Sequence, residues 1–197
     1  MTGSHDIRLV DAGDGRRLER FGARLVDRPH PAASGPRRTI QEWHAADLLF
    51  DRRSGWRGAT DAWEVEPAAG VRMDLRPTPA GGLGLFPEQL ENLAWLAGEI
   101  RERPVPAVLN LFAHTGLLTL AAARAGAAVT HVDGSRPTVA WARHNAEASE
   151  LAAAPIRWIV DDAVAFTRRE ARRGRRYDGL VLDPPAYGHG ARHAFEL

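Results

Sequence analysis

The sequence AVLNLFAHTGLLTLAAARA occupies residues 107–125 and divides into three parts. An apolar run reaches Phe112, a polar turn ends at Gly116, and apolar residues at helical spacing continue from Leu117 to Ala125. Short continuous apolar runs are typical of strands that are covered on both faces of a sheet. We therefore expect a buried strand, a tight turn and a helix, which together begin a βαβ unit.

The same alternation continues to residue 182. Residues 137–149 and 163–172 have helical patterns, and Ser135 is expected to cap the first of these helices, with Pro137 in its first turn. A βαβαβαβ series with right-handed crossovers forms a doubly wound, Rossmann-like parallel sheet. The predicted fold class is α/β, with a partial sheet built from strands at residues 107–112, 129–132, 156–160 and 180–182.

The residues before this sheet have a different pattern. Asp14-Gly15 is a favoured hairpin turn, and residues 63–66 and 71–75 alternate with the period of strands. Residues 41–50 are expected to form one helix. The N-terminal part of the chain is therefore predicted to be rich in β-structure.

A glycine-rich segment at residues 80–84 separates the two patterns. We predict two domains, a β-rich lobe over residues 1–79 and an incomplete Rossmann-like domain over residues 80–197. Pro87 is well placed to begin a helix that reaches Arg101, because proline is favoured in the first turn of a helix.

Composition excludes several classes of protein. The 197 residues are 44% apolar with a formal net charge of +1, so nothing in the bulk charge indicates a nucleic acid or a membrane. The absence of cysteine excludes disulfides and thiolate metal sites, and His189 and His193 lack an acidic partner at metal-ligand spacing, so we expect no metal. No signal peptide pattern and no apolar run of about 18 residues is found, which predicts a cytoplasmic protein without membrane contact.

Polar residues follow each of the predicted parallel strands, and parallel strands end at the same edge of a sheet. Gly116 is a single glycine, whereas a dinucleotide turn has three to let the backbone approach a pyrophosphate. The turn therefore favours a cofactor without phosphates, such as S-adenosylmethionine, whose carboxylate could bind the helix N-terminus after Gly116. Asn110 and Thr115 could supply further polar contacts, although a plain turn between a strand and a helix fits the pattern as well.

Acidic residues end the second and third strands. Asp133 lies where a carboxylate accepts hydrogen bonds from ribose hydroxyls, and the alternative is that it caps the helix that follows. One of Asp161 and Asp162 could accept a hydrogen bond from an adenine amino group, while the other caps the next helix.

The fourth strand ends in Asp183-Pro184-Pro185-Ala186-Tyr187. Consecutive prolines fix two φ angles and hold the preceding residue extended, which would present the Asp183 carboxylate and the Tyr187 ring rigidly. This arrangement suits a planar, nitrogen-bearing methyl acceptor stacked on the ring, so Asp183 and Tyr187 are the candidate catalytic residues. The alternative is a rigid loop without a chemical role.

These motifs resemble the class I S-adenosylmethionine-dependent methyltransferases, in particular the large-subunit ribosomal RNA methyltransferases. The resemblance implies S-adenosylmethionine as cofactor and a base of ribosomal RNA as substrate. It implies that Phe86 and Gln89 approach the methionine end of the cofactor, that Asp133 holds the ribose, Asp162 the adenine, and that Asp183 lies beside the methyl group. The matching segments are DAGDGRRLERF (11–21), GLFPEQ (84–89), NLFAHTG (110–116), VDGS (132–135), WARHN (141–145), IVDDA (159–163) and LDPP (182–185). The expected cofactor-binding residues are Phe86, Gln89, Asn110, Phe112, His114, Thr115, Gly116, Asp133, Ser135, Asp161, Asp162 and Asp183.

Two departures from the family accompany this resemblance. His114 stands where the family usually has tyrosine, and the family sheet has seven strands whereas this chain is expected to stop after its fourth. A truncated chain would expose the strand at residues 180–182, and self-association through that edge is expected. The alternative function is a non-catalytic cofactor-binding module that needs a partner or the missing strands. A nicotinamide oxidoreductase is disfavoured because two glycines are missing from the turn.

The sequence RREARRGRR at residues 168–176 is the strongest local concentration of positive charge. It could contact RNA phosphate groups. The more ordinary interpretation is a solvated helix end that interacts favourably with the helix dipole.

Overall fold

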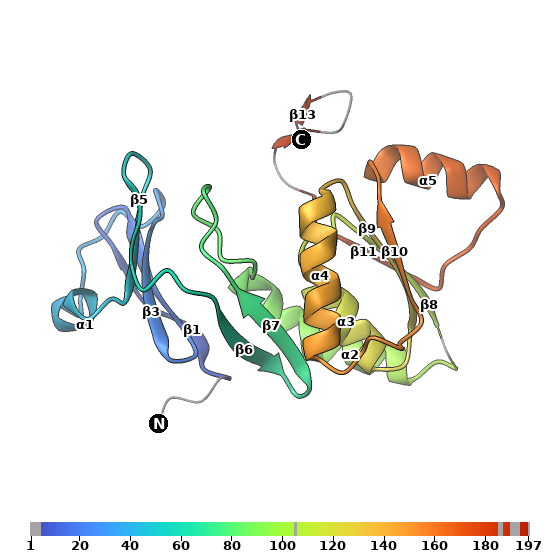
Figure 1. The fold of residues 1–197 in the computed structure, drawn as a ribbon, viewed down its shortest axis with the longest axis horizontal. Coiled ribbons are helices and arrows are strands. Elements are labelled where there is room, and N and C mark those ends of the chain that lie inside the picture. The colour runs from blue at the N-terminus through green and yellow to red at the C-terminus, as the bar shows by residue number, and fades with distance from the viewer. Residues whose placement is uncertain (1–4, 105, 185–186, 190–193, 197) are drawn as a thin grey trace. The chain divides into compact units, whose positions relative to one another are not determined.

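The protein is described by a computed structural model that covers residues 5–104, 106–184, 187–189 and 194–196, without the side chains after residue 184. The chain divides into two compact units, Met1–Pro87 and Glu88–Leu197, which are described separately (Figure 1). The domain boundary at residue 79 stays a prediction, because compactness alone does not define a domain that folds independently.

The second unit contains the expected parallel sheet. Its strand order is β10-β9-β8-β11, and all three pairings are parallel, which confirms the predicted α/β fold class. A short antiparallel pair, β12 and β13, follows. The strands are β8 (Ala107–Leu111), β9 (Ala128–Asp133), β10 (Ile156–Val160), β11 (Gly179–Leu182), β12 (Tyr187–His189) and β13 (Ala194–Glu196), and the helices of this part are η1 (Pro87–Gln89), α2 (Leu90–Arg101), α3 (Leu117–Arg124), α4 (Arg136–Ala148) and α5 (Ala163–Arg172).

The chain changes direction across the sheet at β8. It runs outward from β8 to β9 and β10, and then returns to place β11 on the other side of β8. On one face of the sheet, Leu109 and Val132 pack against Phe166 of α5. Ligands in open α/β sheets bind beyond the carboxyl ends of the strands at such a change of direction. The candidate site should therefore lie beyond the carboxyl end of β8.

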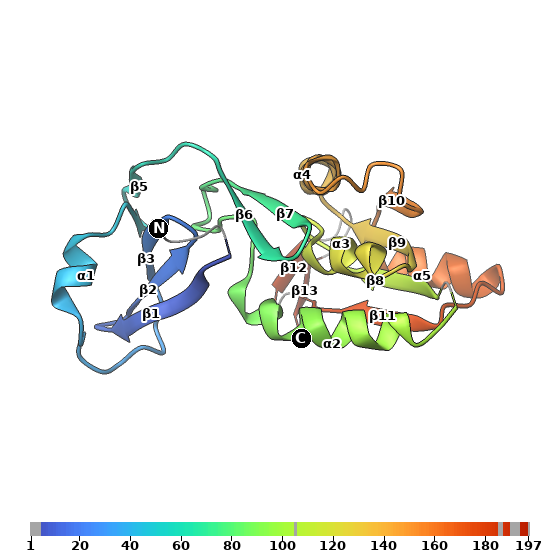
Figure 2. The same cartoon turned by 90° about the horizontal axis from the view of Figure 1, so that it is seen from below.

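The first unit is rich in β-structure, as predicted. Its five-stranded sheet has the order β1-β2-β3-β4-β5, and a separate hairpin pairs β6 with β7 (Figure 2). The elements are β1 (Ile7–Gly13), β2 (Arg16–Phe21), β3 (Arg24–Pro29), α1 (Ile40–His44), β4 (Leu48–Asp51), β5 (Gly55–Gly58), β6 (Trp63–Ala68) and β7 (Val71–Leu75). No helix in the described part of the chain is long and apolar enough to cross a membrane.

The prediction of one helix over residues 41–50 is wrong. The helix α1 ends at His44, and the strand β4 begins at Leu48. Leu48 and Phe50 are both buried and lie two positions apart, which is the period of a strand. The Asp47 carboxylate accepts a hydrogen bond of 2.7 Å from the backbone N–H of Leu25 and so fixes the start of β4 beside β3.

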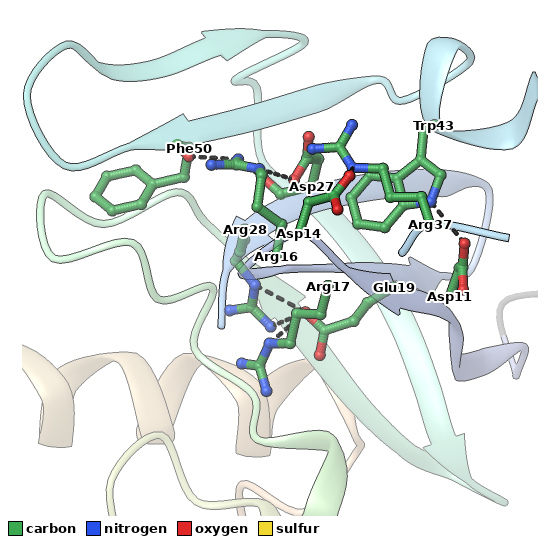
Figure 3. Close-up of polar contacts among 10 residues, drawn as sticks. All are labelled: Asp11, Asp14, Arg16, Arg17, Glu19, Asp27, Arg28, Arg37, Trp43 and Phe50. Carbon is green, nitrogen blue, oxygen red and sulfur yellow. Dashed lines mark hydrogen bonds and ion pairs between the residues drawn. The ribbon is translucent and has the colours of Figure 1, made fainter. Parts of the chain in front are cut away.

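The Asp11 carboxylate organises the segment between β3 and β4 (Figure 3). One oxygen accepts hydrogen bonds from the Trp43 indole N–H at 2.8 Å and from the backbone N–H groups of Arg38 at 2.7 Å and Thr39 at 3.0 Å. The indole hydrogen bond, followed by the backbone donors, holds the pKa of Asp11 well below its usual range, although burial opposes this. The carboxylate thus accepts hydrogen bonds from donors that lie 27 to 32 positions further along the sequence.

Two ion pairs, one buried and one partly buried, connect β2 with β3 (Figure 3). The Arg28 guanidinium contacts Glu19 at 2.5 Å, and the Arg16 guanidinium contacts Asp27 at 2.5 Å. Arg16 also donates a hydrogen bond of 2.8 Å to the carbonyl of Phe50, which ties β2 to β4. A shift of β2 by one residue would separate the charges of both pairs, so they specify the register of the sheet.

We predict that Asp11→Ala lowers the free energy of unfolding by about 3 kcal/mol, because it leaves the buried Trp43 N–H without its acceptor. The pKa of Asp11 is depressed in the folded state, so its contribution is present above about pH 4 and is lost as the pH falls further. Chemical denaturation monitored by circular dichroism at pH 7 and pH 3 measures both effects. Asp61→Ala, which removes an exposed carboxylate of the same unit, is the control and should change little. Equal effects of the two substitutions would contradict the role of Asp11.

Candidate functional site

The turn after β8 has an unusual backbone conformation, and Asp133 at the end of β9 holds it in place. Phe112, His114 and Gly116 all have positive φ angles, of 53°, 49° and 93°. One oxygen of Asp133 accepts a hydrogen bond of 2.9 Å from the backbone N–H of His114, and the other accepts one of 2.9 Å from the backbone N–H of Ser135. A single carboxylate therefore joins the turn that follows β8 to the turn that follows β9.

The register of the sheet brings the other strand ends to the same place. Leu111 lies opposite both Val132 of β9 and Leu182 of β11, and Val160 of β10 lies opposite Asp133. All four strands therefore end at one level, which we call the carboxyl edge. The residues that follow the four strands therefore begin at one edge of the sheet.

Gly116 is required at its position for two reasons. Its φ of 93° is disfavoured for residues with a side chain, and an added Cβ would lie 3.1 Å from the Cβ of Ala142 on α4. Asn145, which is fully buried on the same helix, donates a hydrogen bond of 2.9 Å to the carbonyl of Thr115. The sequence interpretation gave Asn145 no role of its own, although a polar residue on the apolar face of α4 was a detectable signal.

The Asn110 side chain belongs to a buried polar chain. It is 3% exposed, and its amide nitrogen donates a hydrogen bond of 2.9 Å to the hydroxyl of Thr119, which lies 2.9 Å from Nδ1 of His131. Within the described residues, Nε2 of His131 has no hydrogen-bond partner. Burial, followed by repulsion from the protonated form of His114 and from Arg143, lowers the pKa of His131 to about 3. The His131 ring is therefore neutral at physiological pH.

His114 has a backbone role and a largely buried ring. Burial lowers the pKa of His114, and the neighbouring Asp133 carboxylate opposes this effect. The ring nitrogen Nδ1 lies 3.3 Å from the hydroxyl of Thr115. Burial thus favours the neutral form of the imidazole beside the turn.

Helix capping separates the alternatives that the sequence left open for the acidic residues. Ser135 caps α4 by accepting a hydrogen bond of 3.3 Å from the backbone N–H of Thr138, so this helix does not need Asp133 as its cap. Asp162 caps α5 by accepting a hydrogen bond of 2.8 Å from the backbone N–H of Ala165. The predicted adenine contact of Asp162 would have to coexist with this cap.

Asp161 connects the third strand end to the site. Its backbone N–H donates a hydrogen bond of 3.0 Å to the carbonyl of Asp133. Its side chain forms an ion pair with Arg169 of α5. The backbone of Asp161 therefore contacts that of Asp133, and the charge of the Asp161 side chain is partly neutralised.

Asp183 is connected to the start of α2. The amide nitrogen of Gln89 donates a hydrogen bond of 2.7 Å to the Asp183 carboxylate, and the amide nitrogen of Asn92 donates one of 2.8 Å to the carbonyl oxygen of Gln89. Two predicted site residues thus touch each other although they are 94 positions apart. Asn92 was not identified from the sequence, but it lies one helical turn after Gln89.

The part of the predicted site that follows Pro184 is only partly described. Pro185 and Ala186 lie outside the described residues, and of Tyr187 only the backbone, as part of β12, is described. Phe86 is 45% exposed and belongs to the first unit, so its relation to the carboxyl edge stays a prediction.

The chain is similar in fold to solved structures of methyltransferases. The structure of an S-adenosylmethionine-dependent methyltransferase from Agrobacterium tumefaciens matches with a TM-score of 0.91 and 38% identity, over 97% of this chain and 64% of that one. A putative methyltransferase complexed with S-adenosylhomocysteine matches with a TM-score of 0.75 over 98% of this chain and 55% of that one, and at 18% identity it supports the fold alone. The fold is that of an S-adenosylmethionine-dependent methyltransferase.

Sequence comparison points to a narrower group. The chain is 29% identical over 124 residues to the ribosomal RNA large subunit methyltransferase I of Tolumonas auensis, covering 62% of this chain and 30% of that protein. It is 39% identical over 80 residues to the methyltransferase K/L of Syntrophotalea carbinolica, covering 40% of this chain and 11% of that protein. No family profile matches the chain. The predicted resemblance is confirmed, and the chain spans less than a third of the length of these two relatives.

We predict that Gly116→Ala destabilises the protein more than Gly126→Ala. Both glycines have positive φ angles, but an added Cβ at Gly126 would meet nothing within 4 Å. The control should cost only the backbone strain of about 1 kcal/mol, whereas Gly116→Ala also pushes against Ala142. Thermal unfolding of both variants measures the difference. Adding Ala142→Gly should restore part of the lost stability only in the Gly116 variant. If the two substitutions are not coupled in this way, the contact between residues 116 and 142 does not contribute to stability.

A second prediction concerns acid stability. The pKa of His131 is about 3 in the folded protein and about 6.5 in the unfolded chain, so only the unfolded state binds this proton between the two values. Stability due to His131 is therefore complete above about pH 6.5 and falls by up to about 1.4 kcal/mol per pH unit below it.

His131→Gln keeps a polar partner for Thr119 and removes the titration. The free energy of unfolding of this variant should depend less on pH between pH 4 and 6 than that of the parent. Burial lowers the pKa of His114 in both proteins. The difference between their two pH profiles therefore reports the titration of His131. Parallel pH profiles would exclude a buried neutral His131.

Proposed function

We propose that the chain is an S-adenosylmethionine-dependent methyltransferase that acts on a base of ribosomal RNA. The observation that carries the proposal is the Asp133 carboxylate, which holds the turn after β8 from the end of the adjacent strand. The similarity in fold to the Agrobacterium enzyme supports the cofactor. The names of the curated relatives support ribosomal RNA as the partner, and we place the protein in the cytoplasm with its substrate.

The residues at the carboxyl edge fit a cofactor without phosphates. The turn after β8 offers one glycine and the N-terminus of α3, which suits the carboxylate of a methionine group. We propose that Asp133 binds the ribose hydroxyls. Both oxygens of the Asp133 carboxylate are already oriented by backbone N–H groups. The full proposed set is Phe86, Gln89, Asn110, Phe112, His114, Thr115, Gly116, Asp133, Ser135, Asp161, Asp162 and Asp183.

The bound cofactor would supply a methyl group on a positively charged sulfur. The protein must then align the acceptor with this methyl group and stabilise the charge that develops on the acceptor. Asp183 is suited to this task because Gln89, itself held by Asn92, fixes the orientation of its carboxylate. We assign Tyr187 to stack against the acceptor base.

The alternative is a cofactor-binding module without turnover. Binding and transfer must therefore be measured separately, with S-adenosylhomocysteine and NAD as competing ligands and with methyl-labelled S-adenosylmethionine and 23S ribosomal RNA as substrates. We expect binding of S-adenosylhomocysteine, no binding of NAD, and methyl transfer to the RNA. Cofactor binding without any transfer would favour the alternative, and preferential binding of NAD would exclude the proposal.

We predict that Asp133→Ala weakens S-adenosylhomocysteine binding about tenfold to a hundredfold, because a charge-assisted hydrogen bond of about 1.5–3 kcal/mol is lost. Isothermal titration measures this change. Asp178→Ala is the matched control, because Asp178 also accepts a backbone N–H, from Ala107 at 2.8 Å, but at the amino ends of β8 and β11. Equal affinities of the two variants would show that Asp133 does not contact the cofactor.

A further inference from the structure

The end of α5 carries an excess of positive charge. Residues 168–176 contain six arginines and one acid, whereas the whole chain has a net charge of only +1. Arg169 forms an ion pair with Asp161, and Arg173 lies 3.2 Å from Glu170. These two arginines have structural partners, so only the remaining four arginines are candidates for binding a ligand.

The only acid of this segment is turned inward. Glu170 is 3% exposed, and its carboxylate accepts a hydrogen bond of 2.6 Å from the hydroxyl of Tyr177. Arg157 lies 3.4 Å from the same carboxylate. The hydrogen bond from Tyr177, together with these arginines, lowers the pKa of Glu170 although burial opposes this. Glu170 therefore stays ionised, but its charge is already matched by internal partners.

Four arginines remain on the outside, and we call them the α5 patch. Ala163, Phe166 and Glu170 define the buried face of the helix, so residues two positions further on, Arg168 and Arg172, face the opposite way. In the part of the chain that the structure describes, the side chains of the α5 patch make no hydrogen bond or ion pair. The α5 patch consists of the exposed residues Arg168, Arg172, Arg175 and Arg176.

The helix end itself does not need these arginines. Gly174 has a φ of 65° and ends the helix in a Schellman motif, in which its N–H bonds the carbonyl of Ala171 and the N–H of Arg175 bonds that of Glu170. The last carbonyls are thus satisfied by the backbone. The sharp reversal at Gly174 keeps Arg175 and Arg176 at the end of the helix that carries Arg172.

We propose that the α5 patch binds phosphate groups of the RNA substrate at a distance from the methylated base, an inference that rests on the proposed function. Arginine is suited to phosphate because its planar guanidinium donates two parallel hydrogen bonds. The ten residues of α5 span about 15 Å from Asp162 at the carboxyl edge. Figure 1 shows the C-terminal end of α5 pointing away from the strand ends. The patch therefore anchors RNA beside the site without lining it.

The test measures the salt dependence of RNA binding. A fluorescein-labelled RNA hairpin is titrated with the full chain and with Arg168→Gln/Arg172→Gln, and the affinity is followed by anisotropy from low to moderate salt. Removal of two phosphate contacts should weaken binding about tenfold and reduce the slope of log affinity against log salt by about 2. Isothermal titration of both proteins with S-adenosylhomocysteine should give equal affinities.

The matched control is Arg101→Gln/Arg103→Gln. It removes the same charge at the end of α2, where both arginines are exposed but alternate with Glu99 and Glu102. The proposal that the α5 patch binds RNA phosphate would be overturned by an equal loss of RNA affinity in the control. An unchanged salt slope in the α5 variant would overturn it as well. The proposal would also be overturned if the protein bound anionic vesicles but not the RNA hairpin. Failure of the parent to bind S-adenosylhomocysteine would instead contradict the proposed function.

Discussion

The hydrogen bonds of the Asp133 carboxylate are the interaction on which the candidate site depends. The turn after β8 contains three residues with positive φ, and such a backbone persists only where its surroundings hold it. One oxygen of Asp133 stabilises the turn by accepting a hydrogen bond from the backbone N–H of His114. Its second oxygen accepts one from the backbone N–H of Ser135 and so orders the start of α4. Because Asp133 is the last residue of β9, the pairing of β9 with β8 decides whether this carboxylate reaches the turn.

A layer of buried polar side chains supports the turn from below. Asn110, Thr119 and His131 form a continuous chain of contacts between β8, α3 and β9. Buried polar groups are costly unless they are paired, and the neutral His131 ring keeps this cost lower than a charged one would. The chain therefore specifies how α3 lies against the sheet, at the same point where α3 begins to form the site.

The parallel sheet could be predicted from sequence because its signals are local. Apolar runs, Ser135 and the single Gly116 each determine the conformation of the residues next to them. The segment 41–50 was misread because its strand is stabilised by β3 and β5, which are distant in sequence. Asn92 was missed because it acts through Gln89, a contact that only the folded chain reveals, whereas Asn145 was detectable in the sequence as a polar residue on the apolar face of α4.

The hydrogen bond from Asn145 to the carbonyl of Thr115 also has a consequence for the order of folding. During synthesis the chain reaches Thr115 thirty residues before Asn145, so the turn after β8 exists for a time without its partner. Domains fold as units while the N-terminal part emerges first. The turn can therefore reach its final conformation only after β9 has paired and α4 has docked, so the candidate site is completed late in the synthesis of the chain.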